Sequence, residues 1–384
     1  MTRTVLCHVP ELMAYDLGDA HPMKPVVPLL AVDLARACGL LDQPQVEVVN
    51  PGPATVDEIT RVHAPAYVQQ VQRYSANPEL AASWEAGQWG LGLAGDTPAV
   101  AGLHDAAAAL CGVARGAALA VWEGRARQAL ALSGGLHHAL RNRASGFSVY
   151  NDPAIAIQTL LDAGAERVAY VDVDAHHGDG VQWIFYDDPR VLTCSVHESG
   201  RHLFPGTGAL EERGTGEATG TAINVPLPPF SGDGPYLRAV EEVFAPAVRA
   251  FRPDVLVVEI GWDGHHADPL THLQLTLDGF LALFGLLSTL ASDAAHGRTL
   301  VIGCGGYDTD LIPRAITLLL ADMIGVEIDD QVPKEWIATA RRLTGREPSA
   351  LLRTDPGSTV PSAQRERADL EGDQVVDLAR AMVT

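Results

Sequence analysis

The stretch DVLVVEIG, residues 254–261, is apolar at nearly every position. A strand with one face in water alternates apolar and polar side chains, whereas a strand covered on both faces reads as a continuous apolar run. This stretch therefore predicts a central strand of a sheet that has helices on both faces. Six further apolar runs predict strands at 4–9, 128–134, 167–174, 191–197, 221–227 and 299–306.

The segments between these runs are rich in alanine and leucine and have helical periodicity, for example at 153–164 and 236–251. Strands that alternate with helices are typical of βαβ units with parallel strands. Long loops are expected at 75–100 and 198–220, and such loops are usually functional. We expect one domain at 1–325 and a partly helical C-terminal extension at 326–384 that packs on or flanks it, with a charged helix at roughly 363–382.

The composition excludes some classes of function. A net charge of −21 argues against direct nucleic-acid binding, although it favours cationic substrates at long range. Five cysteines without a CxxC pair predict reduced thiols and a cytoplasmic location. The N-terminal stretch does not read as a signal peptide, and no long uninterrupted apolar window predicts a membrane span. The sequence carries no prediction of the oligomeric state.

The stretch YVDVDAHHGDG, residues 170–180, places acidic residues at the end of a predicted strand, where aspartate is uncommon. If the chain stays extended, Asp172, Asp174 and His176 share one face. Aspartate and histidine are ligands of Zn²⁺ and similar ions. Taken alone, this cluster is read equally well as a metal site or as a strand end at which Asp172 and Asp179 bond loop amides.

Three other predicted strands also end in polar residues. Asp263 follows the opening strand and is the natural third metal ligand, whereas His265 and His266 are better read as exposed loop histidines. His137 and His138 follow the run at 128–134; because neighbours point apart in an extended chain, they predict two acid–base groups rather than a chelating pair. GCGGYD, residues 303–308, offers a tyrosine hydroxyl, or else a glycine turn with a packing tyrosine.

The carboxyl ends of parallel strands lie at one edge of a sheet, so these four clusters are expected to converge there as an enzyme site. The chemistry that these residue types indicate is metal-assisted attack of water on a carbonyl. A histidine would take the proton, and Tyr307 would stabilise the oxyanion.

Seven motifs, in this order along the chain, resemble those of zinc-dependent histone deacetylases, and in particular the bacterial acetoin-utilisation type. They are HPMKP (21–25), SGGLHHA (133–139), RASGFSVYND (143–152), DVDAHHGDGVQ (172–182), FPGTG (204–208), DGHHADPL (263–270) and GCGGY (303–307). The resemblance implies the single-domain arginase/deacetylase α/β fold, with a central, mostly parallel eight-stranded sheet and helices on both faces.

The resemblance also implies a role for each site residue. The implied metal ligands are Asp174, His176 and Asp263. The implied catalytic residues are His138 as general base, His137 as its electrostatic or acid neighbour, Asp172 and Asp179 as their carboxylate partners, and Tyr307 on the substrate carbonyl. The implied channel residues are Phe147, Phe204, Gly146 and Leu270, with Asp96 as an acid at the rim. A structural K⁺ site is implied at Asp172, Asp174, His176 and Ser195.

The implied activity is Zn²⁺-dependent (or Fe²⁺-dependent) hydrolysis of acetyl-lysine in proteins. An acetylpolyamine or another small amide is the alternative substrate. His177 and Gly178 disfavour a two-metal ureohydrolase, and the complete set of site residues disfavours a catalytically silent binding module. Cys304, in place of the family's usual glycine, together with Trp262 and Leu136, leaves the acyl size of the substrate open.

Overall fold

The computed structural model describes residues 3–18, 20–93 and 95–383. At its centre lies one sheet in the order β2-β1-β3-β8-β7-β4-β5-β6, and every neighbouring pair of these strands is parallel. The strands are β1 (Thr4–Cys7), β2 (Val46–Val49), β3 (Gln128–Ala131), β4 (Val168–Asp172), β5 (Val191–Glu198), β6 (Ala222–Leu227), β7 (Val255–Gly261) and β8 (Thr299–Gly305). The predicted α/β fold is confirmed, and the sheet is wholly parallel.

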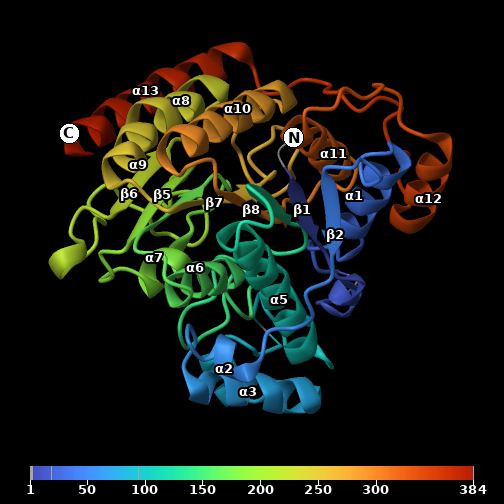
Figure 1. The fold of residues 1–384 in the computed structure, drawn as a ribbon, viewed down its shortest axis with the longest axis vertical. Helices are drawn as coiled ribbons and strands as arrows, with labels where there is room; N and C mark the ends of the chain where they lie inside the picture. Colours follow the sequence, from blue (N-terminus) through green and yellow to red (C-terminus); the bar gives the residue numbers. More distant parts are fainter. Residues whose placement is uncertain (1–2, 19, 94, 384) are drawn as a thin grey trace.

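Helices cover both faces of the sheet (Figure 1). On one side of the sheet, a single hydrophobic cluster includes residues of α2 (Val56–Ile59), α3 (Pro65–Ala76), α5 (Leu103–Trp122), α6 (Asp152–Asp162) and α7 (Asp179–Ile184), and α3 contacts α5. The other face packs against α1 (Val26–Ala37), α8 (Asp233–Arg238), α9 (Ala245–Phe251), α10 (Leu277–Ala294), α11 (Leu311–Ile324), α12 (Lys334–Thr344) and α13 (Ser362–Val383). Every residue of β7 is buried as a result, as the apolar run predicts.

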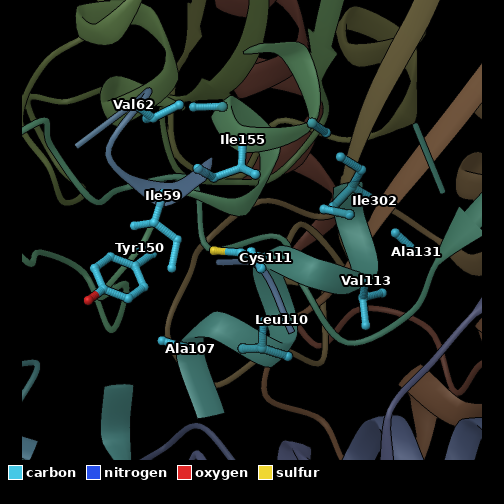
Figure 2. Packing of buried hydrophobic residues seen from close by; sticks show 14 of the residues in the cluster. Ile59, Val62, Ala107, Leu110, Cys111, Val113, Ala131, Tyr150, Ile155 and Ile302 are labelled. Atoms are coloured by element: carbon cyan, nitrogen blue, oxygen red, sulfur yellow. The ribbon is translucent and has the colours of Figure 1, made fainter. Parts of the chain in front are cut away.

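Helix α5 is the main buried helix of the first face. Figure 2 shows its Leu110, Cys111 and Val113 close to Ile155 of α6 and Ile302 of β8. The many alanines of α5 allow helix and sheet to approach closely. Helices α5 and α10 are each long and apolar enough to cross a membrane, but 78% of the apolar window of α5 is buried inside this fold. The corresponding share for α10 is 44%, so α5 is the more deeply buried of the two.

Each of the seven predicted apolar runs contains a strand, but β2 was not predicted. This edge strand has the sequence VEVV and is only partly buried, so it does not form a continuous apolar run. Its position at the edge of the sheet explains why its pattern differs from that of the central strands.

The predicted helix at 236–251 is helical throughout but is not one regular helix. Helix α8 is followed by a π-helical turn at Ala239–Phe244 and then by α9, whose first turn contains Pro246. Proline has no backbone N–H to donate to the preceding turn, which favours such an irregularity.

Helix α13 lies where the sequence predicts a charged helix. It packs against α8 and the edge of the sheet at β6 (Figure 1). Arg238 of α8 forms an ion pair of 2.6 Å with Asp373, and the N–H of Gly232 donates to Asp369 at 2.7 Å. The C-terminal extension is therefore held by both apolar and polar contacts.

We predict opposite effects for the same substitution at two helical glycines. Gly112→Ala in α5 would place Cβ 2.0 Å from the carbonyl oxygen of Gly52, so it should lower the unfolding free energy by about 1–3 kcal/mol. Gly285 in α10 is exposed and has nothing within 4 Å, so Gly285→Ala should raise the unfolding free energy by about 0.5–1 kcal/mol. Urea denaturation measures both, and shifts of the same sign would contradict this packing.

Candidate active site

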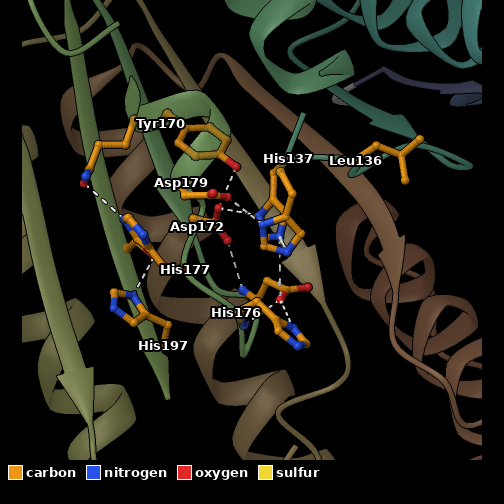
Figure 3. A network of polar contacts seen from close by, with 12 residues as sticks. Leu136, His137, Tyr170, Asp172, His176, His177, Asp179 and His197 are labelled. Atoms are coloured by element: carbon orange, nitrogen blue, oxygen red, sulfur yellow. Dashed lines mark hydrogen bonds and ion pairs between the residues drawn. The ribbon is translucent and has the colours of Figure 1, made fainter. Parts of the chain in front are cut away.

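The four polar clusters follow four strands that are adjacent in the sheet. Strands β3, β8, β7 and β4 are neighbours, and each is followed by one cluster. Because the strands are parallel, the segments that follow them leave the sheet at one edge, where ligand sites form in such folds. Figure 3 shows that His137, Asp172 and His176 come together there.

Asp174, His176 and Asp263 form a buried group whose ligand atoms all lie within 4.8 Å of one another. His176 Nδ1 is 3.1 Å from Asp174 Oδ1 and 2.7 Å from Asp263 Oδ2. The N–H of Ala175 donates to Asp263 Oδ1 at 2.9 Å and orients that carboxylate. Two carboxylates and one imidazole are a donor set that suits Zn²⁺ or a related divalent ion, so these residues fit a metal site.

The chain does not stay extended from Asp172 through Asp174 to His176. Strand β4 ends at Asp172, and the chain then bends. Asp172 accepts a hydrogen bond from the hydroxyl of Tyr170 at 2.7 Å, whereas His176 turns toward Asp263. The N–H of Asp174 donates to Asp172 Oδ1, which stabilises the bend. The side chains meet because the chain turns, not because they share a strand face.

His137 and His138 lie side by side, so the prediction that they point apart is wrong. They lie in a turn after β3 rather than in an extended segment, and their Nε2 atoms are 3.0 Å apart. His137 Nδ1 is 2.8 Å from Asp172 Oδ2, and His138 Nδ1 is 2.7 Å from Asp179 Oδ1. Each carboxylate accepts the Nδ1–H of one histidine and so sets its tautomer.

The surroundings separate the protonation states of the two histidines. Burial opposes the charged form of His137, but the carboxylates of Asp172 and Asp174 outweigh it and raise the pKa of His137 to about 9. Burial lowers the pKa of His138 well below its ordinary value, and the nearby His137 lowers it further. At neutral pH this favours a charged His137 beside a neutral His138, whose Nε2 can accept a proton.

Tyr307 reaches the same site from the end of β8. Its N–H donates to Asp268 Oδ2 at 2.9 Å, and its ring meets the ring of Phe147 edge-on at 6.1 Å. Burial raises the pKa of the Tyr307 hydroxyl well above its ordinary value. The hydroxyl therefore stays protonated and can donate a hydrogen bond.

A cavity of about 90 Å³ opens onto these groups. Its walls include the two histidines of the tandem, Asp174, His176, Phe147 and Tyr307. Its walls also include Tyr15, which no sequence motif indicated. The Tyr15 hydroxyl donates to the carbonyl of Phe147 at 2.7 Å, so it holds the backbone beside the channel.

Of the other predicted channel residues, Gly146 lines this cavity, whereas Phe204, Leu270 and Asp96 do not. A Cβ on Gly146 would come 2.5 Å from the His138 ring and 2.8 Å from the Phe204 ring, so only glycine fits between them. Phe204 and Leu270 are partly exposed, with 41% and 39% of their surface accessible, and neither lines the inner cavity. Asp96 accepts a hydrogen bond from the N–H of Gly146 at 3.1 Å. Its carboxylate therefore already supports the channel backbone.

Cys304, Leu136 and Trp262 differ in whether they line the cavity. Cys304 and Leu136 line the cavity. Trp262 does not line it: the side chain is 1% exposed and packs against Phe280 and Phe284 of α10, with ring centroids 5.1 and 5.3 Å away. The Trp262 side chain therefore lies in the hydrophobic core and not in the cavity wall.

Ser195 and His177 lie next to the site without facing the proposed metal. Ser195 of β5 is the register partner of Asp172, and its hydroxyl is 2.9 Å from His197 Nδ1. His177 turns away from the triad: its Nδ1 is 2.8 Å from the Thr207 hydroxyl, and Figure 3 shows it beside His197.

Residues 21–323 match the histone deacetylase domain family. The acetoin utilization protein AcuC of Bacillus subtilis (strain 168) is 40% identical over 369 residues, which cover 95% of this chain and 93% of that protein. The AcuC proteins of Staphylococcus xylosus and Staphylococcus aureus (strain MRSA252) are each 35% identical, over 85% and 88% of this chain and 84% and 86% of their own lengths. The chain belongs to the histone deacetylase family. It is thus a deacetylase-type hydrolase of a metal-dependent family.

Two further residues shape the histidine turn of this deacetylase. Asn151 Nδ2 donates to the carbonyls of His137 and Ala139 at 2.8 and 3.0 Å. Asp152 accepts from the N–H groups of Gly135 and Leu136 at 3.0 and 2.8 Å. The family motif at 143–152 contains both, but no residue pattern in the sequence indicates these long-range bonds.

The interpretation of His265 and His266 as exposed loop histidines is wrong. Their side chains are only 1% and 3% exposed. His265 Nε2 is 3.3 Å from Asp355 Oδ2, and His266 Nε2 is 2.5 Å from Asp355 Oδ1. Asp355 of the C-terminal extension contacts both imidazoles.

We predict that Gly261→Ala disrupts the metal site of this deacetylase. The new Cβ would lie 1.8 Å from Asp174 Oδ2, so the carboxylate would have to move. Bound metal per chain and deacetylase turnover should both fall at least about 10-fold. Gly234→Ala, at an exposed position with nothing within 4 Å of the new Cβ, is the control. Wild-type metal content in Gly261→Ala would contradict the proposed ligand set.

Proposed function

We propose that this deacetylase hydrolyses the acetyl amide of acetyl-lysine side chains in proteins. The observation that carries the proposal is the cavity of about 90 Å³ that is lined by Phe147, His138 and Tyr307, and by Asp174 and His176 of the buried triad. An acetylated lysine is a neutral, slender chain with a carbonyl at its tip. Aromatic walls suit its methylene groups, and the polar groups at the inner end suit its carbonyl.

The proposed roles follow from the tautomers and charges of the site. Neutral His138 holds its Nδ1–H toward Asp179, so its Nε2 accepts the proton of the attacking water. Tyr307 donates a hydrogen bond to the oxygen on which negative charge develops. The carbon–nitrogen bond then breaks, and charged His137 supplies a proton to the departing amine. The products are a lysine amine and acetate.

The family's metal dependence fits the triad of Asp174, His176 and Asp263. We propose Zn²⁺, or Fe²⁺, as the ion that they hold. Such an ion would polarise the carbonyl and lower the pKa of water at the site. We also propose a structural K⁺ beside Asp172 and Ser195, which are partners on adjacent strands, with oxygens from the segment of Asp174 and His176.

An acetylated polyamine is the second candidate substrate, and the net charge of −21 favours it because polyamines are cationic. The segment around 75–100 favours a protein substrate instead. Ala81 lies in the turn Pro78–Ala82, Ala86 lies in helix α4 (Trp84–Gln88), and Leu91 follows that helix. All three side chains are buried, so this segment folds back onto the protein.

We further propose that the protein acts in the cytoplasm and does not bind nucleic acid directly. All five cysteines are free thiols, which supports a reducing compartment, and the acidic charge opposes binding to phosphates.

A substrate panel with and without chelator tests this function. An acetyl-lysine peptide should be hydrolysed with a higher kcat/KM than an acetylpolyamine or a long-chain acyl-lysine peptide. Chelation should abolish turnover, and added Zn²⁺ or Fe²⁺ should restore it. Turnover that persists in chelator would rule out the metal-dependent mechanism, and a higher kcat/KM for acetylpolyamine would support the second candidate.

His138→Ala and Tyr307→Phe should each keep the metal and lose activity. We expect kcat to fall about 10²–10⁴-fold for His138→Ala and about 10²–10³-fold for Tyr307→Phe, because one loses the base and the other the oxyanion donor. His202→Ala, at an exposed histidine outside the cavity, is the control. Metal analysis and steady-state kinetics measure both effects, and a wild-type rate in either variant would remove that residue from the mechanism.

A further inference from the structure

Asp355 lies outside the region that matches the deacetylase family, yet it contacts the loop that follows β7. The family match ends at residue 323, and Asp355 belongs to the segment between α12 and α13. Its two carboxylate oxygens lie 3.3 Å from His265 Nε2 and 2.5 Å from His266 Nε2. His265 is two residues from Asp263, the proposed metal ligand.

Two backbone groups orient the Asp355 carboxylate. The N–H of Leu277, at the start of α10, donates to Oδ2 at 2.9 Å, and the N–H of Gly357 donates to Oδ1 at 3.2 Å. Burial alone would raise the pKa of Asp355, but the bonds from Leu277 and His266 outweigh it and lower the pKa well below its ordinary value. Asp355 is therefore an ionised acceptor that faces donors on all sides.

The tautomer of His265 distinguishes a hydrogen-bonded contact from a second metal site. Two histidines and an aspartate with ligand atoms within 4.8 Å could in principle hold an ion. However, the N–H of Ala267 donates to His265 Nδ1 at 3.2 Å, so Nδ1 carries a lone pair. In a neutral imidazole the proton is then on Nε2, which donates to Asp355 and has no lone pair for a metal.

Hydrogen bonds in the loop after β7 connect the contact between Asp355 and His265 to the reaction centre. The carbonyl of His265 accepts the N–H of Asp268 at 2.9 Å, and the Asp268 carboxylate accepts the N–H of Tyr307 at 2.9 Å. The N–H of His266 donates to the carbonyl of Leu275 at 3.0 Å, which ties the other side of the loop to the segment before α10. Displacement of His265 would therefore reach both Asp263 and Tyr307.

We propose that Asp355 is a positioning residue for deacetylation: from the C-terminal extension, it holds the loop that carries Asp263 and orients Tyr307. The proposal rests on the proposed roles of Asp263 and Tyr307. The C-terminal extension would then contribute to catalysis, although it lies outside the region that matches the family domain.

Asp355→Asn tests the proposal in the full-length enzyme. The amide would turn one acceptor oxygen into an NH₂ group that faces existing N–H donors, so the loop should shift. We expect kcat to fall about 10-fold with little change in KM, and the metal to dissociate about 10-fold more readily in competition with a chelator. The metal measurement needs no substrate, so it remains informative even if the acetyl-lysine proposal fails.

Asp330→Asn is the matched control. Asp330 accepts the N–H of Arg353 at 2.9 Å and so holds the same segment, but it does not touch the loop after β7. If Asp355 acts only by keeping the extension folded, both variants should lower thermal stability and kcat alike, which would overturn the proposal. A low kcat in Asp355→Asn alone, at equal thermal stability, supports it.

A double-mutant cycle provides an independent check. His266→Ala, Asp355→Asn and the double variant are compared for kcat and for metal dissociation. Contact partners should show non-additive effects, with the double variant little worse than Asp355→Asn. Fully additive effects would show that the two side chains act separately, and the positioning role would be rejected.

Discussion

The rest of this site depends on one requirement: the carboxylates buried at the strand ends must be paired and hydrogen-bonded. An ionised carboxylate removed from water is unfavourable by several kcal/mol unless it is paired and hydrogen-bonded. Asp172, Asp174 and Asp263 are at most 5% exposed, and each has an imidazole or N–H partner. The histidines are therefore structural partners of the acids as well as chemical groups. Their positions and charges are set by the same contacts.

Glu259 is also a buried carboxyl group, but it has no such partner in the described part of the chain, and its neutral form is favoured instead. It lies in β7, in register with Asp172, and neither of its carboxylate oxygens has a hydrogen-bond partner among the described residues. Burial raises its pKa well above the ordinary value, and the charge of Asp172 raises it further. Both effects favour the neutral form of Glu259. An additional negative charge here would repel the carboxylates that hold the histidine tandem and the proposed metal.

The deacetylase domain and the C-terminal extension share one hydrophobic core rather than forming separate units. Val376 and Ala379 of α13 are buried in the cluster that contains Phe244 and Val225. Trp336 of α12 donates from Nε1 to the carbonyl of Leu30 in α1. Arg314 of α11 is buried and donates to carbonyls at 352 and 354, which leads the chain directly to Asp355. Arg314 therefore anchors the extension just before Asp355, which contacts the active-site loop.

The sequence by itself determined the architecture and the chemical inventory of this protein. Burial on both faces imposes a continuous apolar run on each central strand, so these strands and their polar ends are visible in the residue pattern. Half-buried β2 has no such run, and it was missed. The parallel order then places His137, His138, Asp263 and Tyr307 at one edge.

Only the tertiary structure decided which of these groups contact one another. Asp172 and His137 are 35 residues apart, Asp263 and His176 are 87 apart, and Asp355 and His266 are 89 apart. No periodic pattern in the sequence indicates the turn that brings His137 and His138 together. None indicates that Trp262 packs in the core either. Periodicity in the sequence indicates which face of its own strand or helix a residue lies on. These contacts depend instead on how separate strands, helices and loops pack together.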